Sequence, residues 1–252
     1  MDTIKTISEH RSIRNYKSDA IDESILNQIL EAASRASTTG NMQVYSIIVT
    51  RDEEKKKQLC GLHFNQKMVV QAPVILTFCA DFYRFNQWCK QRDAEPGYDN
   101  FLSFMTAAID ALLAAQNAAL AAESFGLGIC YLGTTTYNAD KLIDFFQCPE
   151  GVVPITTLVV GYPNESPELT DRLPLEAIVH HENYQPYTAE KIDALYQEKE
   201  NLPLTMKLIE ENQLKNLAQI FTQKRYIKKD NKYFSKSFLN VMTNQGFMNN
   251  DE

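Results

Sequence analysis

The 252-residue sequence lacks the cysteine patterns by which disulfide frameworks and metal sites are recognised. Its five cysteines stand at positions 60, 79, 89, 130 and 148, an odd number without a CxxC pair or Cys/His ligand spacing. This pattern indicates neither a disulfide framework nor a zinc site, and we interpret the cysteines as small buried residues in a reducing compartment. A chain of this length buries roughly 70 to 75% of its unfolded surface, so folding needs no disulfide or metal.

An excess of positive charge is also lacking. There are 25 lysines and arginines against 32 aspartates and glutamates, which gives a formal net charge of −7. Nucleic acids are held by clustered cations, so we expect no nucleic acid partner, although a small cationic pocket for one phosphate is compatible with this balance. The N-terminal residues contain no apolar run of the secretory type, and we therefore expect a cytoplasmic location.

Long hydrophobic runs are limited to one segment, 105–128, which is rich in alanine and leucine. That segment carries Asp110, Gln116, Asn117 and Glu123. Polar residues at these positions favour a long helix buried in protein over a membrane span, and no membrane association is expected.

Catalytic and nucleotide-binding signatures are missing as well. The patterns GxSxG, HExxH, GxxxxGK[ST] and GxGxxG do not occur, and the adjacent histidines His180 and His181 form no simple metal-binding motif. A chain without an obvious nucleophile, metal cluster or acid/base pair either binds a ligand or relies on a cofactor for its chemistry. We therefore assign no catalytic side chain and no metal ligand.

The apolar pattern predicts short strands separated by helices. Strands are expected over 44–50, 74–81, 130–132 and 155–161. Helices are expected over 3–9, 53–62 and 139–146. A further helix begins after Asp22 as its N-cap, and the long alanine-rich segment forms a helix that extends to residue 125. This order is typical of an α+β fold with a mixed sheet flanked by helices. Near residue 200 the composition shifts toward Lys, Asn and Gln, which predicts a main domain over 1–199 and a C-terminal helical arm over 200–252.

Four polar segments are candidates for ligand binding. In 10–14, HRSIR, two guanidinium groups three residues apart can converge at a helix end on a phosphate, or the segment is only a solvated basic patch. Segment 37–43 offers hydroxyls and an amide, or is a helix C-cap with Gly40 in a left-handed turn. In 131–134, Gly133 permits close backbone approach to a flat ligand, and the fourth candidate is Arg172.

Together and in this order, these segments resemble the FMN-dependent nitroreductases. The matching motifs are HRSIR at 10–14, STTGNMQ at 37–43, QAP at 71–73, AAESFGLG at 121–128 followed by Y.G, GYP at 161–163 and R.P at 172–174. The resemblance covers about residues 3–187 and is greatest to the branch of oxygen-insensitive NADPH nitroreductases and Vibrio-type flavin reductases.

The resemblance implies a nitroreductase-like homodimer with two FMN sites at the subunit interface and C-terminal helices that embrace the partner. It places the phosphate and ribityl chain at the N-terminal motif with a further contact from Arg172, and it places Thr38 and Gln66 beside the flavin. The implied cofactor-binding residues are His10, Arg11, Ser12, Arg14, Thr38, Gln66, Tyr131, Leu132, Gly133, Thr134 and Arg172.

The implied activity is a ping-pong hydride mechanism from NADPH or NADH through FMN to flat, electron-poor acceptors such as nitroaromatics or quinones. One alternative is an NAD(P)H:flavin reductase that supplies reduced FMN, and another is a non-enzymatic protein that binds phosphate or flavin. Thr134 stands where relatives often have glycine, and Thr170 replaces a phosphate-contacting lysine. The relatives' arginine-rich loop for NADPH has no counterpart in 200–215, so the sequence leaves the choice between NADPH and NADH open.

Overall fold

The computed structural model describes residues 2–249, which form two compact units. The first unit spans the chain up to Glu168 and resumes at Phe234, and the second unit is Leu169–Tyr233. The boundary expected from composition, between 199 and 200, falls inside the second unit. As a division between an FMN-binding domain and a C-terminal extension, it stays a prediction.

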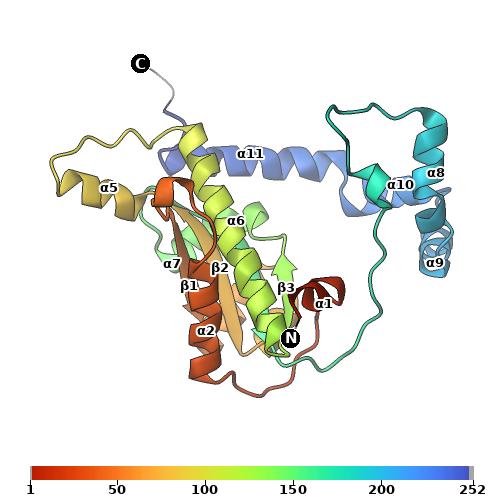
Figure 1. Ribbon diagram of the computed structural model, residues 1–252, viewed down its shortest axis with the longest axis horizontal. Coiled ribbons are helices and arrows are strands. Elements are labelled where there is room, and N and C mark those ends of the chain that lie inside the picture. The colour runs from red at the N-terminus through yellow and green to blue at the C-terminus, as the bar shows by residue number, and fades with distance from the viewer. Residues whose placement is uncertain (1, 250–252) are drawn as a thin grey trace. The chain divides into compact units, whose positions relative to one another are not determined.

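A four-stranded sheet forms the centre of the first unit (Figure 1). Its strands are β1 (Tyr45–Thr50), β2 (Val74–Asp81), β3 (Gly128–Leu132) and β4 (Val152–Gly161), in the order β1-β2-β4-β3. All three pairings between these strands are antiparallel. The α+β class is confirmed, whereas the expected mixed sheet is corrected to an antiparallel one. Both β2 and β4 are buried along their whole length, which produces the continuous apolar runs otherwise typical of parallel strands.

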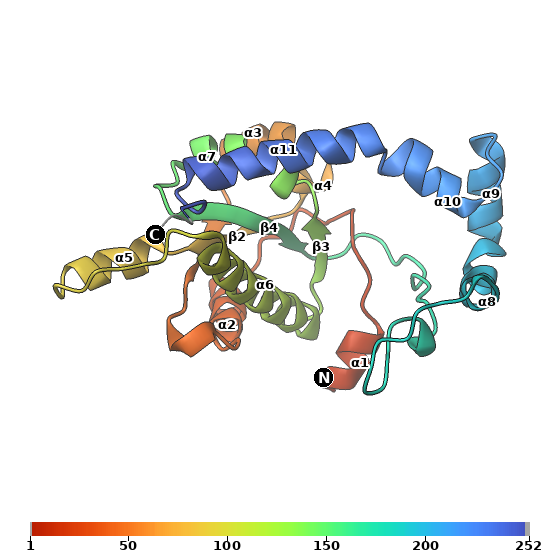
Figure 2. The ribbon, with the colours of Figure 1, turned by 90° about the horizontal axis from the view of Figure 1, so that it is seen from above.

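Helices cover both faces of this sheet (Figure 2). On one face lie α2 (Glu23–Ser34) and α6 (Phe101–Ser124), and on the other α3 (Glu53–Leu62), α4 (Met68–Gln71) and α7 (Ala139–Phe146). The Asp22 carboxylate accepts a 2.8 Å hydrogen bond from the Ser24 amide, so the predicted N-cap of α2 is confirmed. Asp52 and Asn100 cap α3 and α6 in the same way, which fixes where these helices begin.

The long helix α6 has a buried and an exposed side. Most of its alanines are buried in the core with α2 and the sheet, and Ala107, Ala111 and Ala114 are fully buried. On the other side Leu102, Ile109 and Leu112 are exposed by 75%, 49% and 47%. By length and composition the helix is able to cross a membrane, but half of its apolar window is buried inside the protein. The predicted burial therefore holds for one face only.

The remaining helices are short, apart from the one near the C-terminus. They are α1 (Thr3–Ser8), α5 (Tyr83–Lys90), α8 (Ala189–Glu200), α9 (Pro203–Glu211), α10 (Leu217–Ile220) and α11 (Lys228–Asn244). The second unit contains α8, α9 and α10, and α11 continues into the first unit, where Val241 and Met242 are buried in the core. The expected helical character of the chain after residue 200 is present.

Candidate functional site

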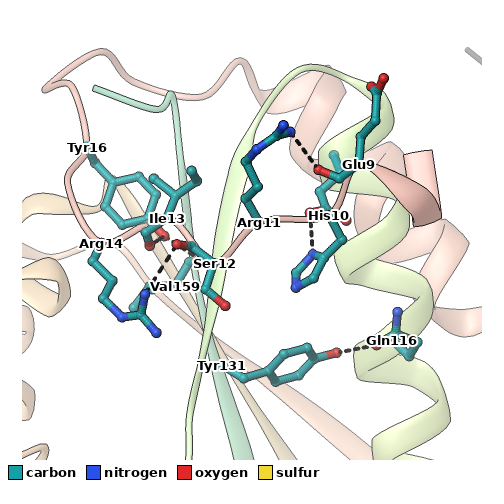
Figure 3. Close-up of polar contacts among 11 residues, drawn as sticks. Glu9, His10, Arg11, Ser12, Ile13, Arg14, Tyr16, Gln116, Tyr131 and Val159 are labelled. Atoms are coloured by element: carbon teal, nitrogen blue, oxygen red, sulfur yellow. Dashed lines mark hydrogen bonds and ion pairs between the residues drawn. The ribbon is translucent and has the colours of Figure 1, made fainter. Parts of the chain in front are cut away.

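The motif at 10–14 is an extended chain beside β3. Helix α1 ends at Ser8, and the Ile13 amide donates a 2.9 Å hydrogen bond to the Ile129 carbonyl. A parallel bridge joins Ser12 to Ile129 at the same place. Alternate residues of an extended chain face opposite sides, so side chains three positions apart diverge. The predicted convergence of Arg11 and Arg14 at a helix end is therefore wrong, and Figure 3 shows their guanidinium groups pointing in different directions.

Each polar side chain of this segment is held differently. His10 Nδ1 lies 2.6 Å from a carboxylate oxygen of Glu123 on α6. Arg11 donates through Nη1 to the Glu9 carbonyl at 2.9 Å, and its buried Nε has no hydrogen-bond partner among residues 2–249. Arg14 is exposed, and its Nη1 is 3.5 Å from the Ser12 carbonyl. Within the described residues neither guanidinium forms an ion pair, so both retain donors for an anionic ligand.

Thr38 precedes a short 3-10 turn, Thr39–Asn41, after the end of α2. The predicted left-handed conformation of Gly40 is confirmed by its φ of +56°. The turn is tied to α6, because the Thr39 amide donates a 3.0 Å hydrogen bond to Asp110 Oδ1. The side chain of Asp110 is buried, and its Oδ2 has no partner in the described chain. Asp110 was not predicted as a site residue, although a carboxylate within an alanine-rich helix is a signal for such an anchoring role.

The end of β3 presents an open backbone. The Tyr131 hydroxyl donates to Gln116 Oε1 at 3.3 Å (Figure 3), and burial raises the pKa of Tyr131 above its ordinary value, so the phenol is neutral. Leu132 is only 1% exposed and its carbonyl accepts hydrogen bonds from the amide and the hydroxyl of Thr135, so its contact with a flat ligand stays a prediction. A Cβ built on Gly133 meets no atom within 4 Å, so a flat ligand has room to approach the backbone here.

Gln66 and Thr134 are brought together by a residue that the sequence did not indicate. His63 is fully buried, and its Nδ1 lies 2.7 Å from Thr134 Oγ1. Gln66 Nε2 donates to the His63 carbonyl at 3.1 Å and to Thr134 Oγ1 at 3.4 Å. Loss of hydration on burial lowers the pKa of His63 to about 4, so its ring is neutral at neutral pH. No local pattern could have revealed this contact, since it joins residues 71 positions apart.

Arg172 belongs to the second unit. It is exposed, and its Nη1 donates to the carbonyls of Thr170 and Asp171 at 3.1 and 3.0 Å. The Asp171 carboxylate forms a 2.5 Å ion pair with Lys199. The carboxylate next to Arg172 is thus neutralised by Lys199. That Arg172 and residues 10–14 contact the same phosphate stays a prediction. In the described part of the chain, no group of three or more acidic, histidine or cysteine side chains is able to hold a metal ion.

Comparison with known proteins shows which families and structures this chain is similar to. The model of the nitroreductase family matches residues 7–162. The chain is 39% identical over 188 residues to an FMN reductase (NADPH) of Bacillus subtilis, covering 74% of this chain and 76% of that protein. It is 36% identical over 196 residues to an oxygen-insensitive NADPH nitroreductase of Salmonella typhimurium, covering 78% and 80%. A solved structure from Bacteroides fragilis superimposes with a TM-score of 0.96 at 55% identity, covering 97% of this chain and all of that one.

Proposed function

Since the chain belongs to the nitroreductase family, we propose that it is an FMN-dependent NAD(P)H oxidoreductase that reduces flat, electron-poor acceptors such as nitroaromatics or quinones. The observation that carries the proposal is the match of the family over residues 7–162, which contain ten of the eleven implied cofactor-binding residues, all except Arg172. Relatives named as an FMN reductase (NADPH) and an NADPH nitroreductase support both the flavin and the electron donor.

The residues present fit FMN. A phosphate needs hydrogen-bond donors that are not already bound to carboxylates, and the buried Nε of Arg11 has no partner in the described chain. A flavin ring needs close approach to the backbone, and the space above Gly133 is open. Gln66 and Thr134 add polar groups next to that space.

In the proposed mechanism, bound FMN supplies the hydride and electron-transfer chemistry. His10, Arg11, Ser12 and Arg14 would hold the phosphate and ribityl chain, with Arg172 as a further cationic contact. The backbone of 131–134 would support the ring, and the side chains of Gln66 and Thr38 would orient it. No side chain acts as nucleophile or metal ligand, so the protein acts by binding, orientation and electrostatic stabilisation.

We further infer that the enzyme is a cytoplasmic homodimer. The exposed side of α6 carries a stripe of large apolar side chains, Leu102, Met105, Ile109, Leu112 and Leu113, each at least 39% exposed. Apolar stripes of this kind on one helix are covered in most proteins, and a second copy of this chain is the occupant we propose. The C-terminal helices are proposed to embrace that partner. Free cysteines at all five positions support a reducing compartment.

A second candidate, the release of reduced FMN as product, is favoured by the similarity to an FMN reductase. Steady-state rates with a nitroaromatic, a quinone and free FMN as acceptor, each at the same concentration, separate the two functions. The proposed oxidoreductase reduces the first two at least as fast as FMN. A strong preference for free FMN would replace it by the flavin reductase, and a protein that binds no FMN would contradict both.

A further inference from the structure

The strongest unassigned feature is the buried imidazole of His63. It lies at the C-terminal end of α3, and its side chain is completely buried. One ring nitrogen, Nδ1, is 2.7 Å from Thr134 Oγ1, while the other, Nε2, has no partner among the described residues. Only one of the two ring nitrogens, Nδ1, thus has a hydrogen-bond partner, and that partner is a residue of the proposed flavin pocket.

The side-chain amide of Gln66 shows that the Thr134 hydroxyl oxygen accepts a hydrogen bond. Its Nε2 contacts the His63 carbonyl, which only accepts hydrogen bonds, so the orientation of the amide is fixed. The same Nε2 is 3.4 Å from Thr134 Oγ1, and its two hydrogens are therefore directed to the His63 carbonyl and to the Thr134 hydroxyl oxygen. Thr134 accepts at least this hydrogen bond.

The choice of His63 tautomer follows from the unpartnered Nε2. With the hydrogen on Nε2, a buried N–H has no acceptor, a defect that is rarer in folded proteins than an under-used acceptor. With the hydrogen on Nδ1, His63 donates to Thr134, and the two lone pairs of Oγ1 are filled by His63 and Gln66. The hydroxyl hydrogen of Thr134 is then used by neither His63 nor Gln66, and Thr134 is only half-buried, so this hydrogen remains for a ligand.

We propose that His63 is a positioning residue that, with Gln66, holds the Thr134 hydroxyl as a hydrogen-bond donor toward the flavin. The inference rests on the proposed function, because the acceptor is bound FMN. A glycine at this position, as relatives often have, would offer no hydroxyl for this role. His63 contacts no ligand itself and acts through Thr134.

Contacts around the turn that follows α3 hold His63 and Gln66 in place. Phe64 and Asn65 both adopt left-handed backbone angles, φ of 54° and 56°, a conformation that asparagine adopts readily but that a bulky residue such as Phe64 rarely does. Asn138 Nδ2 donates to the Leu62 carbonyl at 2.7 Å, and the Cys60 thiol lies 3.4 Å from the Gln66 carbonyl. The turn that carries His63 and Gln66 is therefore fixed from both sides.

A donor beside the flavin favours the reduced, more negative form over the oxidised form. Hydrogen bonds to charged groups are stronger than those to neutral groups by a margin that corresponds to about tenfold in an equilibrium constant. We expect Thr134→Val to weaken binding of reduced FMN relative to oxidised FMN by about tenfold. For a two-electron couple this is a midpoint potential about 30 mV lower.

The test measures the midpoint potential of bound FMN in single and double variants. His63→Asn retains an amide donor near the Nδ1 position and is expected to keep the wild-type potential, whereas His63→Gln places its amide near Nε2 and is expected to lose the same tenfold as Thr134→Val. The double variant H63Q/T134V is expected to equal Thr134→Val alone, since both changes abolish the same hydrogen bond, from the Thr134 hydroxyl to the flavin. Thr135→Val is the matched control, because the Thr135 hydroxyl donates within the fold to the Leu132 carbonyl.

The proposal would be overturned if the shifts in midpoint potential of His63→Gln and Thr134→Val added up in the double variant. It would also be overturned if Thr134→Val shifted the potential while His63→Gln kept the wild-type value. Nitrogen-15 spectra of the imidazole in the FMN-free protein supply a readout that needs no flavin. They are expected to show hydrogen on Nδ1 of His63. Hydrogen on Nε2 would refute the positioning role even if FMN binds, and hydrogen on Nδ1 in a protein that binds no FMN would refute the proposed function instead.

Discussion

At the scale of the residue, His63 links the stability of the fold to pH. Its pKa is about 4 in the folded protein against 6.5 for an unperturbed histidine. Between these values the unfolded chain binds a proton that the folded protein does not, so the free energy of unfolding falls as pH decreases from 6.5 to 4. Complete titration corresponds to a loss of roughly 3 kcal/mol.

Chemical denaturation at a series of pH values checks this dependence, with His63→Asn as the comparison. In a plot of the free energy of unfolding against pH, the variant is expected to show a smaller slope between pH 6.5 and 4, because the imidazole no longer contributes. The contribution of the carboxylates to this slope stays. Equal slopes in both proteins would show that His63 does not remain neutral in the folded state.

Arg14 is the residue whose removal tests the phosphate site most simply. Its guanidinium is exposed and forms no ion pair with the described residues, so Arg14→Ala costs the fold little. Loss of a charge-assisted contact of about 1.5 to 3 kcal/mol predicts roughly 10- to 100-fold weaker FMN binding in a fluorescence titration. Arg51 is a matched control, because its guanidinium pairs with Glu23 elsewhere on the surface, and Arg51→Ala should bind FMN normally.

At the scale of the element, the extended segment 10–14 depends on Gly128 at the start of β3. A Cβ on Gly128 would lie 2.6 Å from Ile13 Cγ1, far inside the contact distance. Gly128→Ala is therefore expected to lower the free energy of unfolding by about 1 to 3 kcal/mol and to weaken FMN binding by displacing the segment. Gly133→Ala adds a Cβ in open space, so it should leave thermal stability unchanged while reducing FMN affinity.

Thermal unfolding and flavin titration of the two glycine variants distinguish these effects. Adding Ile13→Ala to Gly128→Ala removes the close contacts with Cγ1 and Cγ2, while the Cβ of residue 13 at 2.8 Å remains, so only partial recovery of stability is expected. Equal loss of stability in the two single variants would contradict the role assigned to Gly128.

The sequence predicted most elements, because apolar spacing follows directly from burial. The strands β1, β2 and β4 and the helices α2, α3, α6 and α7 lie near their expected ranges. Strand direction was not predictable, since two-sided burial of β2 and β4 looks the same in parallel and antiparallel sheets. The contact between His63 and Thr134 depends on how α3 and the end of β3 pack, which local patterns do not encode.

At the scale of the whole molecule, the exposed side of α6 carries the proposed dimer contact. Ile109→Glu places a charge at the centre of the apolar stripe and is expected to shift the molecular mass in light scattering from dimer to monomer. Leu175 is 73% exposed and lies outside both this stripe and the C-terminal helices, and Leu175→Glu serves as a control that should stay dimeric. A wild-type protein with the mass of one chain would contradict the homodimer.

The overall acidity of the chain, a net charge of −7, is compatible with a local cationic site. Anaerobic addition of NADPH or NADH to the purified, FMN-loaded protein tests its proposed function most directly. We predict a yellow protein whose flavin absorbance bleaches with at least one of the two donors and returns when a quinone or nitroaromatic is added. A colourless protein that takes up no FMN, or bound flavin that neither donor reduces, would contradict the assignment as an NAD(P)H oxidoreductase.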